Sequence, residues 1–457
     1  MKPRNTELAE VAKALSAAVV IGFALQAGAA EITWDRLLNA DKDPNNWLMY
    51  HGSFKGWHYS ALDEINKNNV KSLKLAWIHT PSTSKRGIQS FPLVADGILY
   101  YTSSSGQVWA LDAATGAFIW KYAAKIDWER APYAIAYNRG IAIGYGKVYT
   151  GTVDGRIIAL DAKTGQVAWD KMIRTADKGS KAFTGAPLIV KDKVLIGAFG
   201  GDLSGCCGPI YAVNAQTGEV EWELDTIGGD ERSRASWGND SWKVGGGGGW
   251  MTGTYDPKTN SVWWGTANPA PDYDWAGENW MTEGPRPGTN LYSSSVVVLD
   301  PDSGKLKAYF QEIPHDAWDF DSAVGEFVQI DRGGKRYMLH ANKGGILFVY
   351  NADPDQASDG QVLKVENATA IGKTYNYMKG VNPKTGELIE PLRLPAGKHT
   401  NVCPVLEGVI SWNTGTYNPN TGLYYKVTQK FASTSKCTRW TARQISPVSF
   451  TSALRGP

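Results

Sequence analysis

The chain has 457 residues, a formal net charge of +2 and a sequence pI of about 8.1. This balance gives no reason to expect binding to nucleic acid or to an anionic membrane surface. Charged residues make up 20% of the chain and hydrophobic residues 42%, as is typical of soluble globular proteins. The 50 glycines and 19 tryptophans are unusual, and they favour a fold with many tight turns and large planar side chains between layers.

The first 30 residues have the pattern of a signal peptide. Lys2 and Arg4 provide a basic start, residues 14–25 form an apolar run, and Ala27-Gly28-Ala29 offers small residues for cleavage. The run is shorter than the ~20 residues that a membrane-spanning helix needs. We therefore expect residues 1–30 to direct export to the periplasm and residues 31–457 to form a mature domain that has no membrane span.

A repeated motif organises the chain beyond this segment. An apolar pair is followed by Asp or Asn, two residues, Thr-Gly, three residues and Trp. The three full copies run over residues 110–120, 159–169 and 212–222, and looser copies begin at Asp256, Asp300 and Asn418.

Each copy predicts a pair of antiparallel strands. A strand ends at the Asp, whose side chain can bond the backbone ahead, and Thr-Gly closes a tight turn before the strand that carries the Trp. The period of about 50 residues, with roughly four strands per unit, is typical of β-propeller blades. The sequence therefore predicts an all-β propeller.

The motif resembles the tryptophan-docking motif of the dehydrogenases that depend on pyrroloquinoline quinone (PQQ). Residues 59–77, which end at Trp77, are similar to the start of the first blade in that family, and the resemblance runs from about residue 40 to the end. It implies an eight-bladed type of propeller that holds PQQ on its axis. We count about six blades here, so we expect the chain to be truncated at its C-terminus relative to the family.

The strongest local match is the segment Pro314 to Asp321 (PHDAWDFD). Family members carry His-Asp-x-Trp-Asp here, which implies that Asp319 is the catalytic base or an electrostatic partner of a metal ion. In an extended segment Asp321 would face the same side as Asp319, so both carboxylates could reach one cation. An Asp in this second position resembles the lanthanide-dependent members, whereas calcium is the alternative ion. A solvated acidic turn is the alternative interpretation of the segment.

Two further metal ligands are implied by the resemblance. Asn268, in Ala267-Asn268-Pro269, matches an Asn ligand, although Asn-Pro alone also favours a simple turn. Asp202, after Gly200 and Gly201, stands where relatives carry a Glu, and its shorter side chain would have to reach the ion.

The remaining matches imply a binding site for PQQ. Trp250, after five glycines, matches the floor under the cofactor, and Arg139 matches a partner of a PQQ carboxylate. Further contacts are implied for Gln89, Thr184, Gly200, Gly201, Lys343 and Asn413.

The four cysteines suggest disulfides in an exported chain. The family's vicinal disulfide would fall at Tyr133-Ala134, but the vicinal pair here is Cys206-Cys207, which could stack on PQQ or act as a local constraint. The resemblance implies a bridge between Cys403 and Cys437.

We therefore expect a quinoprotein that oxidises small alcohols and passes the electrons to a soluble cytochrome c, as a monomer or a homodimer. Two alternatives stay open at this point. One is a non-catalytic propeller that binds protein as a scaffold. The other is a truncated relative whose open propeller has no working site.

Overall fold

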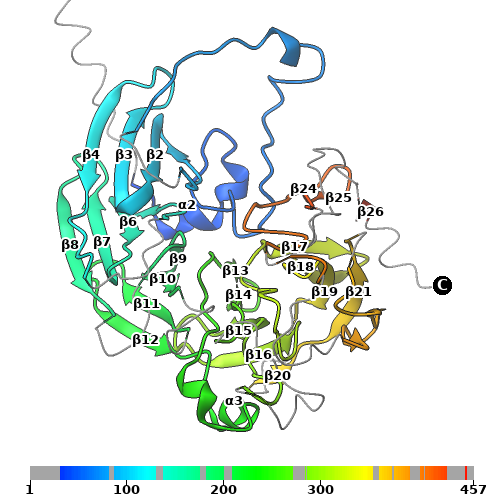
Figure 1. Ribbon diagram of the computed structural model, residues 1–457. Helices are drawn as coiled ribbons and strands as arrows, with labels where there is room; N and C mark the ends of the chain where they lie inside the picture. Colours follow the sequence, from blue (N-terminus) through cyan, green and yellow to red (C-terminus); the bar gives the residue numbers. More distant parts are fainter. Residues whose placement is uncertain are drawn as a thin grey trace, which may run out of the picture. The chain divides into compact units, whose positions relative to one another are not determined.

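The predicted repeat forms antiparallel four-stranded sheets in the computed structural model, and these sheets follow one another in chain order (Figure 1). The structure describes residues 31–81, 87–129, 137–174, 182–199, 208–270, 284, 286–353, 360–372, 375–391, 402–405, 407–429 and 448–449. The unit discussed below comprises Ile32–Pro457.

Each of the first three sheets is a simple meander of four strands. Their strands are β1 (Leu93–Ala95), β2 (Ile98–Ser103), β3 (Gln107–Asp112) and β4 (Phe118–Ala123); β5 (Ala142–Gly144), β6 (Lys147–Gly151), β7 (Arg156–Asp161) and β8 (Val167–Met172); and β9 (Leu188–Val190), β10 (Lys193–Gly197), β11 (Ile210–Asn214) and β12 (Val220–Leu224).

The later sheets are less regular. The fourth sheet contains β13 (Thr254–Asp256), β14 (Ser261–Gly265), β15 (Ser295–Leu299), β16 (Leu306–Gln311) and, parallel to β16, β20 (Gln361–Val362). The fifth contains β17 (Val328–Arg332), β18 (Lys335–Ala341), β19 (Ile346–Asn351) and β21 (Val365–Ala370). A two-stranded hairpin, β22 (Gly380–Val381) and β23 (Leu388–Ile389), precedes a sheet of β24 (Thr416–Asn418), β25 (Leu423–Tyr425) and β26 (Val448–Ser449).

Helices are few and short in the part of the chain that is described. They are α2 (Trp34–Leu38), α3 (Glu231–Ala235) and the 3-10 turns Ala40–Lys42, Val70–Ser72, Ser104–Gly106 and Asp240–Lys243. No helix in these residues is both long and apolar enough to cross a membrane.

The fold confirms the predicted all-β propeller, and the docking tryptophans join neighbouring sheets. The indole N–H of Trp120 on β4 donates to the carbonyl of Ala162 in the next sheet at 3.0 Å. Trp169 and Trp222 make the same contact one sheet further on, with Ala215 and Pro301. Each Trp therefore ties the outer strand of one sheet to the turn of the next.

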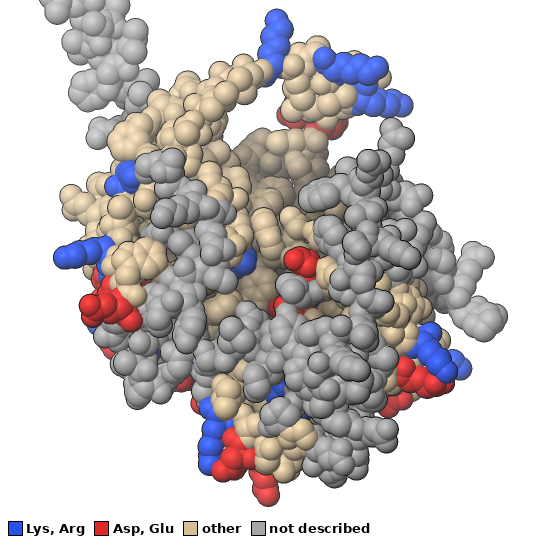
Figure 2. Space-filling model, viewed as in Figure 1, with Lys and Arg blue, Asp and Glu red and all other residues tan. Residues whose placement is uncertain are grey.

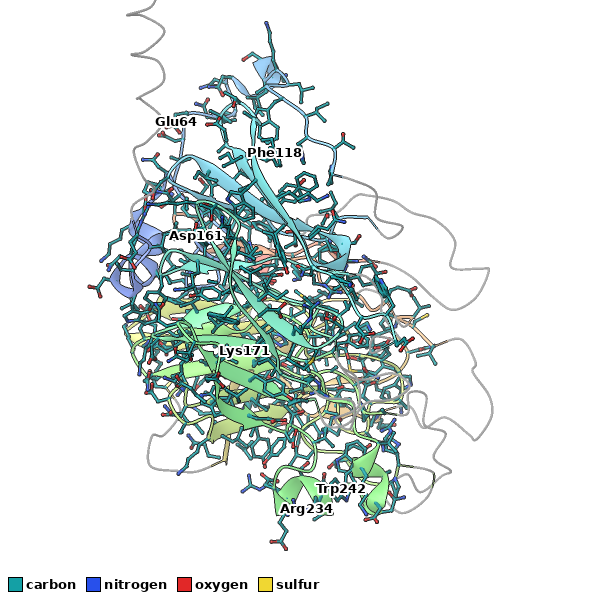
Figure 3. All side chains as sticks on the ribbon, turned by 90° about the vertical axis from the view of Figure 1, so that its left-hand side faces the viewer. Glu64, Phe118, Asp161, Lys171, Arg234 and Trp242 are labelled. Atoms are coloured by element: carbon teal, nitrogen blue, oxygen red, sulfur yellow. The ribbon has the colours of Figure 1, made fainter. Side chains whose placement is uncertain are left out.

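The turns form as the motif predicts. The Asp112 side chain accepts hydrogen bonds from the backbone N–H and the hydroxyl of Thr115, and Asp161 does the same with Thr164. The outer strands carry the exposed face of each sheet, as the positions of Phe118 on β4 and Lys171 on β8 show (Figure 3). The core lies on the inner strands, which are almost wholly buried.

The looser copy at Asp256 forms the predicted pair of antiparallel strands, but at another place in its sheet than the full copies. Asp256 ends β13 and Trp264 lies on β14, so this copy joins the first two strands of a sheet rather than the last two. The Trp264 indole N–H donates to the carbonyl of Gly249, which precedes β13 of the same sheet, rather than to the turn of the following sheet. The sequence pattern could not show this, because the same Asp turn closes either kind of hairpin.

A further copy of the turn went unnoticed in the sequence. Asn382 caps a turn that ends at Gly386, between β22 and β23. A Cβ atom on Gly386 would lie 2.9 Å from the ring of Phe310 on β16, so a phenylalanine fills the space that a tryptophan fills elsewhere. The missing Trp hid this copy from a motif search.

Trp77 repeats the docking contact at the start of the fold. Its indole donates to the carbonyl of Ala113, and its ring packs on Gly116. The segment around it exposes several apolar side chains, namely Leu62, Ile65, Val70, Leu73, Leu75 and Ile78. Trp77 thus occupies the place of an outer-strand tryptophan.

The segment that precedes this region connects several sheets. Trp47 forms a β-bridge with Val94 of β1. The Trp57 indole N–H donates to the carbonyl of Gln329 on β17, and the backbone N–H of Tyr417 on β24 donates to the Trp57 carbonyl. His51 and His58 lie buried in this segment and contact each other at 2.8 Å. The first and last described sheets are therefore linked through residues 47–58.

We predict that the docking turns tolerate no side chain at their glycine. Gly165 and Gly146 share a left-handed backbone, with φ of +71° and +70°, but a Cβ on Gly165 would lie 2.6 Å from the Trp120 ring whereas nothing lies near Gly146. Gly146→Ala should cost about 1–2 kcal/mol from backbone strain alone. Gly165→Ala should cost about 1–3 kcal/mol more, because it overpacks the Trp120 ring. Urea unfolding of both variants measures the difference, and equal losses would contradict the docking account.

We also predict a loss of stability in mild acid. Burial lowers the pKa of His51 to about 4 and that of His58 to about 3. The unfolded chain binds a proton at each site near pH 6.5 and the folded chain does not, so the free energy of unfolding falls as the pH drops below about 6.5.

Between pH 7 and pH 5 each histidine should contribute about 2 kcal/mol to this loss. His58→Asn removes one titrating group and retains a residue that tolerates the positive φ of this position, +46°. Its free energy of unfolding should therefore depend less on pH than that of the wild type. Identical pH dependence in the two proteins would contradict the assignment.

Candidate active site

The predicted site residues come from equivalent positions of successive sheets. Four of them precede the first strand of a sheet: Gln89 before β1, Arg139 before β5, Thr184 before β9 and Trp250 before β13. Two others follow the second strand of a sheet: Asn268 after β14 and Lys343 after β18. The repeat thus brings residues that are distant in sequence to corresponding ends of their strands.

Asp319 and Asp321 lie in the connection between β16 and β17. This connection is a series of turns, and Asp319 has a left-handed backbone with φ of +65°. The expectation of an extended segment was therefore wrong. The two carboxylates nevertheless reach one group, because the turn and not a strand alternation directs them.

That group is the ammonium of Lys343. Its Nζ lies 2.6 Å from Asp319 Oδ1 and 3.8 Å from Asp321 Oδ2, and the Lys343 backbone N–H donates to the Asp321 carbonyl. All three residues are buried, with 4–8% of their surface exposed. Two carboxylates in such surroundings require positive charge close by, which Lys343 provides.

Asn268 is held against the same carboxylates by the glycine run. The Asn268 backbone N–H donates to Asp321 Oδ1 at 2.6 Å. The Asn268 carbonyl accepts from Gly247, and a Cβ on Gly246 would lie 2.6 Å from that carbonyl. The glycines are therefore needed for close backbone packing against residues 267–270, a role that the sequence did not reveal.

Trp250 follows the glycine run and connects the two halves of the site. Its indole N–H donates to Asp321 Oδ2 at 3.2 Å, and the guanidinium of Arg139 lies 4.6 Å from the centre of its ring. Trp250 thus presents an aromatic face beside the carboxylate pair.

Arg139 is a buried cation without a carboxylate partner among the described residues. It contacts the Thr184 carbonyl and the rings of Tyr137 and Trp250, and its Nε has no hydrogen-bond partner in that part of the chain. Burial lowers its pKa to about 10. Two side-chain oxygens of other predicted site residues, Thr184 Oγ1 and Gln89 Oε1, are also buried and have no hydrogen-bond partner in the residues described.

Several predicted site residues cannot be placed. Gly200, Gly201, Asp202, Cys206, Cys207 and Cys437 lie outside the described residues. Cys403 is buried, and its bridge to Cys437 stays a prediction. Asn413 is exposed, and its carbonyl accepts from Lys426, so the structure connects it with Lys426 rather than with the residues above.

No group of three His, Cys, Asp or Glu side chains that could hold a metal ion occurs in the described part of the chain. The candidate set there is two carboxylates and the side chain of Asn268. Such a set of oxygen donors suits a hard cation. The predicted third carboxylate, Asp202, lies outside the described residues.

The sequence analysis missed Asp316 and Tyr50. Asp316 is fully buried, and its carboxylate accepts from backbone N–H groups on both sides of Asp319. An Asp that precedes a turn residue is a known signal for such bonds, and it was present in the quoted segment. Tyr50 packs with the residues around Trp250, and nothing in its local sequence indicates that.

In the space-filling view, charged side chains gather at the periphery and the face is hollowed near its middle, where acidic atoms are visible (Figure 2).

The family model described as glucose/ethanol/alcohol dehydrogenase, beta-propeller domain, with PQQ as its short name, matches residues 47–356. The chain belongs to this family.

Curated relatives agree with this membership. The quinoprotein alcohol dehydrogenase PedH of Pseudomonas putida is 34% identical over 89% of this chain and 70% of its own length. The quinohemoprotein alcohol dehydrogenase of Comamonas testosteroni is 35% identical over 85% of this chain and 55% of its own length. The chain thus spans between about half and 70% of the length of these relatives.

Solved structures agree on the fold. The quinohemoprotein alcohol dehydrogenase ADHIIG from Pseudomonas putida matches 88% of this chain and 59% of its own, with a TM-score of 0.78 and 32% identity. A europium-containing methanol dehydrogenase matches 86% of this chain and 70% of its own, with a TM-score of 0.74 and 29% identity.

The described residues fit the cofactor that gives the family its name. PQQ is a flat quinone with three carboxylates, and the site offers an aromatic face on Trp250 beside a buried guanidinium that has no acidic partner among the described residues. A buried arginine suits a carboxylate ligand, because its planar fork can bond both oxygens.

We predict that the Lys343–Asp319 pair stabilises the protein when no metal is added. Lys343→Met should lower the free energy of unfolding by about 3–5 kcal/mol, because it leaves a carboxylate buried without that cation. Adding Asp319→Asn to this variant should recover part of the loss.

Lys171→Met is the matched control, because the ion pair of Lys171 with Glu219 is exposed. It should cost less than about 1 kcal/mol. Urea unfolding compares the variants, and a Lys343→Met protein as stable as the control would contradict the account.

Proposed function

We propose that this chain is the propeller of an enzyme that oxidises small alcohols with PQQ and one metal ion. The observation that carries the proposal is the pairing of two half-sites across Trp250. On one side lies the buried Arg139, which has no acidic partner in the described part of the chain, and on the other lies the carboxylate pair with Lys343. A protein-binding scaffold has no need for either arrangement.

The cofactor would be held through its carboxylates and its ring. Arg139 would bond a carboxylate of the cofactor. Gln89 and Thr184 precede the sheets on either side of the one that Arg139 precedes, and their side-chain oxygens, which have no partner in the described residues, would provide further polar contacts. The Trp250 ring would support the flat face. Gly200, Gly201, Asn413 and the pair Cys206-Cys207 are proposed as further contacts on the family resemblance alone.

The metal ion would be held by oxygen ligands from three loops. Asp319, Asp321 and the side chain of Asn268 would be three of the ligands, with the Asn268 backbone N–H bonded to Asp321 and both carboxylates beside Lys343, and Asp202 is proposed as the fourth. A third carboxylate suits a trivalent ion, so we favour a lanthanide over calcium. The structural likeness to a europium-containing methanol dehydrogenase supports this choice.

PQQ, when bound, would supply a quinone as the acceptor of two electrons, and the metal ion would supply Lewis acidity. The chain supplies the base and the surroundings. Asp319 would accept the proton of the alcohol hydroxyl, and its bond with the Lys343 ammonium would hold the carboxylate in position. Trp250 anchors Asp321 through its indole N–H.

The electrons would pass to a soluble cytochrome c in the periplasm, consistent with the signal-peptide pattern of residues 1–30. No basic surface or membrane span is required for such a partner. A homodimer is compatible with this function.

The test is dye-linked alcohol oxidation by the purified protein with PQQ, with Ca²⁺ or La³⁺ added. We expect activity with La³⁺ and its loss in Asp321→Ala, because that change removes one ligand and the acceptor of two hydrogen bonds. Asp302→Ala, which removes an exposed carboxylate paired with Lys191, is the control and should retain activity.

Activity with calcium alone would refute the choice of ion and retain the enzyme. No activity and no PQQ binding with either ion would favour a non-catalytic or truncated propeller.

A further inference from the structure

Asp316 lies beneath the turn that carries Asp319 and Asp321. It is fully buried, and burial raises its pKa. Its Oδ1 accepts from the Trp318 N–H at 2.9 Å and its Oδ2 accepts from the Phe320 N–H at 2.8 Å. The two residues that flank Asp319 are therefore bound by one carboxylate.

These bonds fix a strained piece of backbone. Asp319 has φ of +65°, a conformation that residues with a side chain rarely adopt. Such a residue keeps its conformation only when the surroundings determine it, and here the N–H groups on both sides are bonded. The direction of the Asp319 carboxylate toward Lys343 follows from that backbone.

Asp316 is itself held by the segment 286–294. Ser294 donates its hydroxyl to Asp316 Oδ2 at 2.6 Å, and Arg286 donates to the Asp316 carbonyl at 2.9 Å. The same segment bonds His315, whose backbone N–H donates to the Thr289 carbonyl. Because Ser294 leads directly into β15 (Ser295–Leu299), this support continues into the fourth sheet.

We propose that Asp316 is the positioning residue of the site: through Trp318 and Phe320 it sets the turn that brings the carboxylates of Asp319 and Asp321 to one cation. The inference rests on the metal site of the proposed function. Asp316 acts through the backbone N–H groups of the turn that it holds.

The test is Asp316→Asn, which keeps the size of the side chain but offers one acceptor oxygen in place of two. Asp256→Asn is the matched control. Asp256 is equally buried, and its carboxylate accepts from Lys258 N–H, Thr259 Oγ1 and Arg336, none of which is a predicted metal ligand or next to one in sequence.

The readout is binding of Tb³⁺, followed by luminescence excited through tryptophan, because the Trp250 indole lies 3.2 Å from Asp321. Asp316→Asn should weaken Tb³⁺ binding by about 10–100-fold, the usual effect of losing a residue that orients metal ligands. Asp256→Asn should lower the melting temperature and leave Tb³⁺ binding unchanged. PQQ binding without metal, measured by equilibrium dialysis, should be unchanged in both variants.

Tb³⁺ binding by Asp316→Asn at wild-type affinity would overturn the positioning role and leave the proposed function standing. Equal weakening in both variants would also overturn it, since the effect would then follow from lost stability. Failure of the wild type to bind Tb³⁺ would refute the metal site, and the positioning role with it.

Discussion

The site depends on placing two carboxylates beside one positive charge inside the protein. Asp319 and Asp321 share the ammonium of Lys343, and none of the three is more than 8% exposed. Buried charges are costly unless they are paired and bonded, so the surrounding structure must supply their partners. It does so through the Trp250 indole, the Asn268 backbone and the turn above Asp316. The proposed metal ion would bind beside these two carboxylates.

The repeated sheets explain how residues so distant in sequence meet. Each sheet contributes the loop before its first strand or after its second, and the docking tryptophans fix one sheet to the next. Gly246 and Gly247 then allow the backbone before Trp250 to pack directly on Asn268. Positions along the repeat therefore become positions in the candidate site.

The propeller could be predicted from the sequence because its signal is local. Asp112, Thr115 and Trp120 each act within a few residues of their turn, and the motif recurs at an even period. The position of the Asp256 turn within its sheet could not be predicted, since the same turn chemistry closes either kind of hairpin. The family resemblance identified Asp319, Asp321 and Lys343 as candidate site residues, and in the structure both carboxylates lie beside the Lys343 ammonium. The left-handed turn at Asp319 and the support from Ser294 could not be foreseen, because they depend on contacts between segments that the motif does not describe. The same reason hid the link between residues 47–58 and the last described sheet.

The most direct test of the account is crystallography with bound lanthanide and PQQ, using anomalous scattering at the absorption edge of the ion. The account predicts one strong peak between the carboxylates of Asp319 and Asp321, within bonding distance of the Asn268 side chain, with the cofactor ring against Trp250 and a carboxylate on Arg139. A peak at another place, or a cofactor that does not contact Trp250 and Arg139, would contradict it.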